Sequence, residues 1–131
     1  MTFYYGDEMG VTPAKYVAPE LWRNTGLTPA DMDVVQFYDA FTPQIPVSFQ
    51  EYGFCADGEA ADYMSSGANP PYNTSGGGLS EAYVHGFNLL LEGVRQIRGT
   101  STGQVDGVRH SLVTSGNVVP TGAVVYSTEP T

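Results

Sequence analysis

Basic residues are scarce in this sequence, and their scarcity excludes one class of partner. The 131-residue chain has five Lys and Arg against 14 Asp and Glu, which gives a formal net charge of −9. Nucleic acids and anionic membrane surfaces bind proteins through clustered positive charge. We therefore expect neither a nucleic-acid partner nor a membrane-surface partner.

Metal-binding and redox-active residues are scarce as well. Cys55 is the single cysteine, so the sequence allows no intrachain disulfide and no cysteine zinc cluster. No basic residue lies near it in the sequence to favour the thiolate, and we expect an inert, buried thiol. The two histidines, His85 and His110, have no carboxylate at ligand spacing, so we expect no metal site.

Long apolar runs are also missing. No segment approaches the roughly 20 apolar residues of a membrane span. The opening residues, "MTFYYGDEMG", lack the basic start and apolar middle of a signal peptide. We expect a cytoplasmic protein that forms one domain over residues 1–131, because 41% of its residues are hydrophobic.

Proline and glycine mark the helices of the first third. A Thr followed by Pro is a helix-start signal. The second start, in "TPADMD", predicts at most one turn, and the third predicts a helix that Gly53 ends. Pro19 is expected to interrupt the first helix and to open a separate turn, which Gly26 ends. The Thr-Pro pairs are Thr12-Pro13, Thr28-Pro29 and Thr42-Pro43.

The remaining pattern predicts a layered α/β domain. Residues 33–39, "DVVQFYD", have the composition of a short buried strand, and residues 56–78, rich in Gly, Ser, Asn and Pro, predict a long loop or lid. A helix is predicted over 79–98, and two β segments over 109–128 surround a turn at 116–121. The apolar stripe of that helix consists of Leu79, Tyr83, Phe87, Leu90, Leu91, Val94 and Ile97.

A Gly-rich turn, "GGGLSEAYVHG", leads into the predicted helix. It has no Lys followed by Ser or Thr, so it is not a phosphate loop. Tyr83 lies on the first turns of the predicted helix, and Tyr38 ends the predicted strand, where α/β sheets place their sites. From the residues alone, both tyrosines are more often core aromatics than catalytic groups. His85, two residues after Tyr83, is expected to point away from it.

Three stretches resemble the thiolase family, in the family's order and over nearly the whole chain. "GLTPADMDVVQFYDAF" resembles the segment that leads to the "NEAF" motif, and "NTSGGGLSEAYVHG" resembles "NxxGGxxAxGHPxG". "LVTSGNVVPTGAVVYS" resembles the terminal hairpin of the sterol-carrier type of thiolase. The resemblance implies the C-terminal half of the thiolase fold, a mixed sheet covered by helices.

The sequence departs from this family at the catalytic positions. When the motif is registered on Asn73 to Gly86, the family's catalytic His falls on Tyr83, and the "NEAF" Asn falls on Tyr38. The second catalytic Cys is absent from residues 112–117, and the nucleophilic Cys belongs to the other half of the fold. The resemblance therefore implies that this chain does not condense two acyl-CoAs.

Two tyrosines at these positions resemble the lipid-transfer-protein-like aldolases of bacterial steroid side-chain degradation. The resemblance implies retro-aldol cleavage of a β-hydroxyacyl-CoA, giving a ketone and a short acyl-CoA such as propionyl-CoA. Tyr38 and Tyr83 are then the catalytic acid and base, with one phenol pKa lowered from about 10. The turn is expected to offer backbone N–H groups to the thioester oxygen, and the implied substrate-binding residues are Asn73, Gly76, Gly77 and Gly78.

The resemblance also implies partners. They are an acyl-CoA substrate, the missing N-terminal half of the fold or a second copy, and a partner protein with an OB-fold and a zinc ribbon. Coenzyme A enters only as part of the substrate, and no other cofactor is expected. Two alternatives stay open: a non-catalytic half-domain that binds acyl-CoA or lipid or serves in assembly, and a thiolase relative with another acyl-transfer activity. The two-tyrosine mechanism requires the hydroxyls within about 4–8 Å of each other, so that both reach one substrate.

Overall fold

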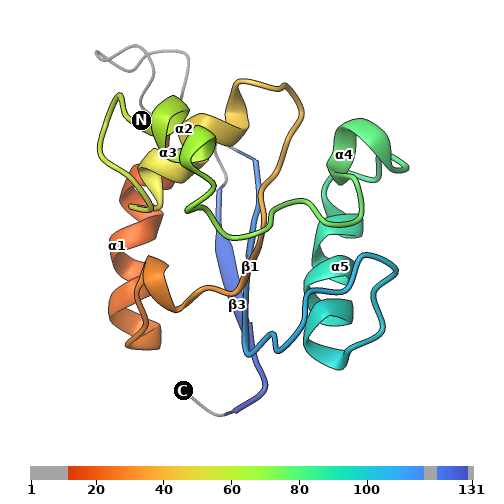
Figure 1. Ribbon diagram of the computed structural model, residues 1–131. Helices are drawn as coiled ribbons and strands as arrows, with labels where there is room; N and C mark the ends of the chain where they lie inside the picture. The colour runs from red at the N-terminus through yellow and green to blue at the C-terminus, as the bar shows by residue number, and fades with distance from the viewer. Residues whose placement is uncertain (1–11, 117–120, 130–131) are drawn as a thin grey trace.

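The computed structural model describes residues 12–116 and 121–129, which form a three-layer α/β arrangement. Helices α1, α2 and α3 lie on one face of a central sheet, and α4 and α5 lie on the other (Figure 1). The elements, in chain order, are α1 (Ala14–Thr25), η2 (Pro29–Asp31), β1 (Val34–Gln36), α2 (Gln44–Glu51), α3 (Ala60–Ser66), α4 (Gly77–Ser80), α5 (Phe87–Arg98), β2 (His110–Thr114) and β3 (Ala123–Ser127).

The sheet is mixed, which confirms the expected fold class. Its order is β1-β2-β3, with β1 parallel to β2 and β2 antiparallel to β3. Val35 pairs with Leu112, which in turn pairs with Val125. A parallel pair needs a long crossover connection, and here the crossover from β1 to β2 contains α2, α3, α4 and α5.

The main core lies between the sheet and the layer of α1 to α3. Phe37 and Phe49 meet edge to face with ring centroids 4.9 Å apart, a preferred aromatic geometry. Both rings are fully buried. The core consists of Ala14, Ala18, Met32, Val35, Phe37, Ile45, Phe49, Tyr52 and Leu112.

Pro19 does not interrupt the first helix, so that prediction was wrong. α1 runs through it from Ala14 to Thr25, with Pro19 on the exposed side. Burial of Ala14 and Ala18 against the core outweighs the one backbone hydrogen bond that the proline removes. Gly26 ends the helix in the left-handed conformation, as predicted.

The segment 56–78 is not entirely a loop, because α3 forms within it. Ala60 is buried, and α3 packs against α2. The low hydrophobicity of this segment concealed a helix that buries only one small side chain. The predicted turn at 116–121 lies largely outside the described residues.

The helix predicted over 79–98 forms as two pieces. α4 ends at Ser80, and α5 starts at Phe87, so Tyr83 lies on the linker 81–86 rather than on a helix. Two consecutive residues, His85 and Gly86, have left-handed φ values of 51° and 79°, which are incompatible with a continuing α-helix. The apolar spacing at 79 and 83 concealed this break.

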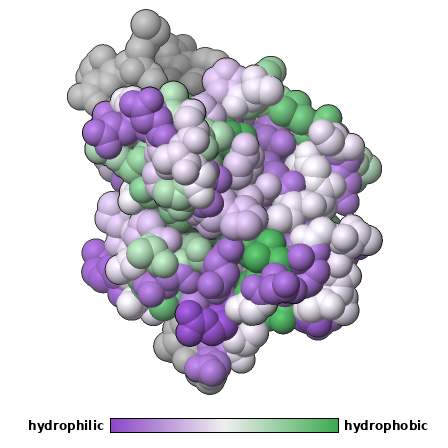
Figure 2. All heavy atoms as spheres, in the orientation of Figure 1, coloured by the Kyte–Doolittle hydropathy of each residue, from purple (hydrophilic) through white to green (hydrophobic). Residues whose placement is uncertain are grey.

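α5 buries three polar side chains, while part of its apolar stripe stays exposed. Asn88, Glu92 and Gln96, spaced four residues apart, are 5%, 1% and 1% exposed. Phe87 and Leu91 are 62% and 46% exposed. Apolar groups reach the surface on the right-hand half of Figure 2, the side of α4 and α5. No described helix has the length and apolarity to cross a membrane.

Candidate active site

Side chains hold the chain in place where it leaves β1. The Phe37 N–H donates to Asn73 Oδ1 at 2.8 Å, and Asn73 Nδ2 donates to the Phe37 carbonyl at 3.0 Å. On the other side, the Tyr38 N–H donates to Thr114 Oγ1 at 3.1 Å. The Asn73 amide thus pairs with the backbone as a neighbouring strand would, and this fixes the direction of Tyr38.

The Gly-rich turn receives the carboxylate of Asp39. Asp39 is 5% exposed, and its Oδ1 accepts the Gly78 N–H at 2.7 Å, while Oδ2 lies 3.5 Å from the Leu79 nitrogen. Gly77 has φ 67°, and a Cβ there would lie 2.3 Å from Asp39 Oδ2. Glycine is needed at this position both for the backbone conformation and for the space.

This geometry changes the expected role of the turn. The Gly78 amide is already engaged by Asp39, and the Asn73 amide group by Phe37, so neither is directed at a ligand. The assignment of Asn73, Gly76, Gly77 and Gly78 to substrate binding stays a prediction. The described contacts make the turn a clamp between the end of β1 and α4.

We expect Gly77→Ala to lower the free energy of unfolding by about 3 kcal/mol or more, because it adds left-handed strain to overpacking against Asp39. The matched control is Gly26→Ala, where φ is 70° but no atom lies within 4 Å of the added Cβ. That control should cost about 1 kcal/mol. Chemical denaturation of the two variants measures the difference, and equal losses would show that the Asp39 contact contributes nothing.

A buried polar network connects α5 to the segment that leads into the Gly-rich turn. Glu92 Oε1 accepts hydrogen bonds from Thr74 Oγ1 at 2.6 Å, Ser101 Oγ at 2.7 Å and Gln96 Nε2 at 2.9 Å. Thr74 is also held by Gln36 of β1, whose Nε2 donates to Thr74 Oγ1 at 2.9 Å. The residue that follows Asn73 is therefore tied to both a strand and a helix.

Tyr38 and Tyr83, the tyrosine pair, meet directly. Their hydroxyl oxygens lie 2.5 Å apart, and their ring centroids lie 6.5 Å apart with the rings inclined at 64°. The oxygens are closer than the expected 4–8 Å, because the hydroxyls hydrogen-bond to each other. Tyr38 is half-buried, whereas Tyr83 is 52% exposed. The tyrosine pair is therefore accessible from the surface, mainly through Tyr83.

The environment of Tyr38 favours its neutral form. The hydrogen bond with Tyr83, followed by burial, raises the pKa of Tyr38 to about 12, and the Asp39 carboxylate acts in the same direction. The expectation that one phenol pKa is lowered therefore does not apply to Tyr38. This residue therefore keeps its proton at neutral pH.

His85 does not point away from the pair, contrary to expectation. Its ring centroid lies 5.1 Å from that of Tyr83. The expectation assumed a helix through both residues, and the left-handed backbone of His85 brings its ring beside Tyr83 instead.

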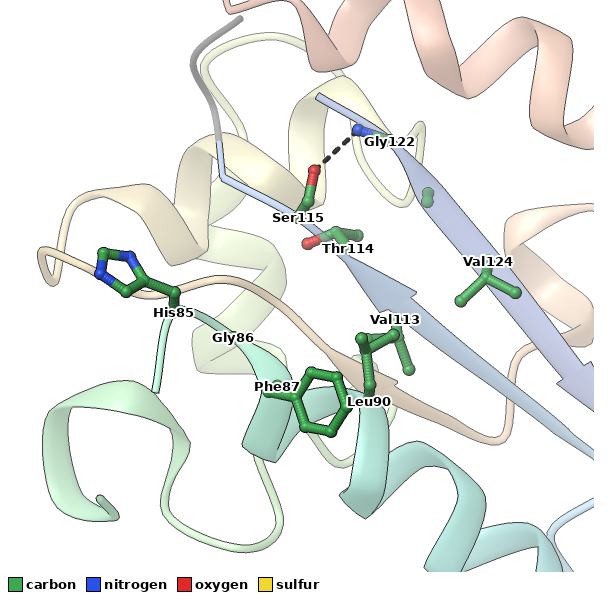
Figure 3. Close-up of a pocket in the computed structure, with 10 residues that line it drawn as sticks. His85, Gly86, Phe87, Leu90, Val113, Thr114, Ser115, Gly122 and Val124 are labelled. Carbon is green, nitrogen blue, oxygen red and sulfur yellow. Dashed lines mark hydrogen bonds between the residues drawn. The ribbon is translucent and has the colours of Figure 1, made fainter. Parts of the chain in front are cut away.

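A small apolar cavity lies beside the pair, between the start of α5 and the ends of β2 and β3 (Figure 3). Its volume is about 210 Å³. Its walls are mainly aliphatic and aromatic, and His85 stands at one end. The lining residues are His85, Gly86, Phe87, Leu90, Val113, Thr114, Ser115, Gly122, Ala123 and Val124.

Two residues that matter for this site were not selected from the sequence. Asp39 was read only as the end of a strand, although its place directly after Tyr38 could have marked it. Glu92 lies off the apolar stripe of the predicted helix, and nothing in that stripe indicated that it would be buried. The four-residue spacing of Asn88, Glu92 and Gln96 was the available signal for a buried polar stripe.

Comparison with known proteins gives consistent matches over almost the whole chain. A family model described as thiolase C-terminal domain-like matches residues 3–127. The chain is 47% identical to 17-hydroxy-3-oxo-4-pregnene-20-carboxyl-CoA lyase from Mycobacterium tuberculosis, over 95% of this chain and 34% of the relative. It is 41% identical to the steroid side-chain-cleaving aldolase of Thermomonospora curvata, over 98% of this chain and 34% of the relative.

The fold matches as well. A solved structure of an Ltp2-ChsH2(DUF35) aldolase superposes with a TM-score of 0.89 at 39% identity, covering 96% of this chain and 35% of that one. The chain thus spans about a third of the length of the curated relatives that it matches.

Proposed function

This chain belongs to the thiolase C-terminal domain-like family, and we propose that it supplies the acid and base of a retro-aldolase that cleaves a β-hydroxyacyl-CoA. The observation that carries the proposal is the direct hydrogen bond between Tyr38 and Tyr83, at 2.5 Å. Two hydrogen-bonded phenols can pass a proton from one hydroxyl to the other. The remainder of the thiolase fold completes the site, and this chain together with that remainder is called the assembled enzyme below.

The reaction conserves the protonation of the tyrosine pair. As the proton of Tyr38 moves to Cα, Tyr83 passes its own proton to Tyr38 and takes the proton of the substrate's β-hydroxyl, so neither phenol carries two protons at any point. As the bond between Cα and Cβ breaks, its electron pair moves to the thioester enolate, and the β-carbon becomes a ketone. Tyr38 donates its proton to Cα, and the short acyl-CoA is released. The raised pKa of Tyr38 means that this residue starts the reaction with its proton in place.

The names of the relatives support a substrate class. The two curated relatives are named for cleaving a steroid side chain and for a steroid carboxyl-CoA. We infer that this chain serves the same class, a steroid side-chain CoA ester with a β-hydroxyl, which gives propionyl-CoA or a similar short acyl-CoA. No second acyl group is transferred, so the reaction needs no cysteine nucleophile.

Partners are part of the proposal. The similar solved structure is named for two components, which supports a second protein in the assembly. We propose that this partner carries the OB-fold and zinc-ribbon domain, that the complex works in the cytoplasm, and that coenzyme A enters only with the substrate.

The test is an assay of the assembled enzyme with a steroid β-hydroxyacyl-CoA. Equal amounts of ketone and short acyl-CoA are expected, without added free coenzyme A. Binding of the ester without cleavage would favour the non-catalytic alternative. Products that appear only when free coenzyme A is added would favour acyl transfer.

Cys55→Ser is expected to leave turnover within about threefold, a change below ~1 kcal/mol in the barrier. Burial, with Glu59 and Asp57 nearby, raises the pKa of the Cys55 thiol, which disfavours the reactive thiolate. Steady-state kinetics of the variant measure the effect. A hundredfold loss in a folded variant would contradict thiol-independent chemistry.

A further inference from the structure

We propose that Gly86 is a positioning residue for the reaction, because the space left by its missing side chain holds the Tyr38 ring against Tyr83. A Cβ built on Gly86 would lie 2.9 Å from Cδ2 and 3.1 Å from Cε2 of Tyr38. Carbon atoms that are not bonded to each other do not approach so closely without displacing one another. The inference rests on the proposed function, since it concerns the placement of the tyrosine pair.

A second glycine lies against the opposite edge of the ring. A Cβ on Gly116 would lie 3.4 Å from both Cδ1 and Cε1 of Tyr38. The ring therefore stands between two residues without side chains, one before α5 and one after β2. We call this space the glycine slot. In Figure 3, Gly86 lies at the start of α5, and Thr114 and Ser115 lie at the end of β2. Gly116 follows Ser115 in the sequence.

Hydrogen bonds hold both Gly86 and the backbone of Tyr38 in place. The Gly86 carbonyl accepts the N–H groups of Leu89 and Leu90, at 3.1 and 3.2 Å, so Gly86 is fixed to α5. The Tyr38 backbone is fixed to Thr114 at 3.1 Å. A side chain at position 86 would therefore turn the Tyr38 ring instead of shifting its backbone.

Gly86 also connects the two tyrosines. It ends the linker 81–86, which carries Tyr83, and its φ of 79° turns the chain into α5. The residue that sets the course of the Tyr83 linker is thus the same residue that contacts the Tyr38 ring. A small displacement here changes the distance between the two hydroxyls directly.

The experiment compares Gly86→Ala with Gly99→Ala in the full chain. Both glycines adjoin α5 and have left-handed φ values, 79° and 67°, but no atom lies within 4 Å of a Cβ on Gly99. Tyrosines labelled with ¹³C at Cζ are titrated by NMR, with the Tyr38 signal assigned from Tyr38→Phe. In G86A, the Tyr38 pKa should fall toward the ordinary value of about 10, while in G99A it should match the parent chain.

Kinetics of the assembled enzyme give the second readout. G86A should lower kcat by about 10²-fold, the effect of a small misplacement of a catalytic group, with little change in KM. G99A should stay within about threefold. In a Tyr38→Phe background, G86A should lower kcat no further, because the Tyr38 hydroxyl that it would misplace is already absent.

Unchanged Tyr38 titration and kcat in G86A would overturn the inference, and so would equal losses in G86A and G99A. Should G86A fail to fold, Gly116→Val applies pressure from the other edge of the ring without left-handed strain. Gly116→Val should lower the Tyr38 pKa. An unchanged Tyr38 pKa in this variant would overturn the inference. If the parent enzyme has no lyase activity, but G86A and not G99A changes the Tyr38 pKa, the proposed function is wrong while the role of the glycine slot in placing Tyr38 still holds.

Discussion

Tyr83→Phe in the assembled enzyme is expected to lower kcat for retro-aldol cleavage by about 10² to 10⁴-fold, the contribution typical of a general acid or base. The substitution removes the oxygen that lies 2.5 Å from the Tyr38 hydroxyl, so the path from the substrate's hydroxyl to Tyr38 is broken. Tyr38→Phe should have an effect of the same size, because it removes the donor to Cα. Steady-state kinetics with the steroid ester measure both.

The two losses should not add, since both variants break one relay. The double variant should be no slower than the slower single variant. Tyr16→Phe is the matched control, because Tyr16 is 73% exposed on α1, on the opposite face of the sheet. Stability should change by only about 1 kcal/mol in each catalytic variant, the value of one hydrogen bond. Full turnover in either variant would eliminate the relay.

The second large effect concerns the chain by itself, for which we expect no lyase turnover and concentration-dependent self-association. α5 buries Asn88, Glu92 and Gln96, while two residues of its apolar stripe, Phe87 and Leu91, stay exposed, which is unusual for a surface helix. Leu79, Val84, Phe87 and Leu91, the apolar face, are 46–62% exposed. Apolar surface of this kind marks an interaction site, and the chain spans only about a third of its curated relatives.

Sedimentation over a range of concentrations and an activity assay test this expectation together. Adding the remainder of the thiolase fold should suppress self-association and restore turnover. Leu91→Gln should weaken that recovery, whereas Tyr16→Gln, an exposed aromatic on the other side of the sheet, should not. A monodisperse chain with full activity would mean that the apolar face needs no cover.

Local signals in the sequence were enough to predict the mixed sheet and several of the helix ends. Strong β formers placed β1, β2 and β3, and Gly26 ended α1 as expected. The motif register brought Tyr38 and Tyr83 to one place, although 45 positions separate them in the chain. That register came from a family resemblance, since the two residues share no local pattern.

The departures came where tertiary contacts override local preference. Nothing in the spacing of 79–98 reveals the break that puts Tyr83 on a linker, because two left-handed residues cause it. The Gly-rich turn was expected to face a ligand, yet its space is taken by Asp39, 38 residues before Gly77. Glu92 lies off the apolar stripe of the predicted helix yet is buried, and its three hydrogen-bond donors made this burial possible.

Cleavage in D₂O tests the central claim most directly. A retro-aldol reaction forms a thioester enolate that the tyrosine pair protonates at Cα, and the phenol protons exchange with solvent. Mass spectrometry of the short acyl-CoA released by the assembled enzyme should therefore find one deuterium on Cα. Unlabelled propionyl-CoA incubated with the same enzyme gives the background exchange. A product with no deuterium above that background would contradict an enolate intermediate and, with it, the role assigned to Tyr38 and Tyr83.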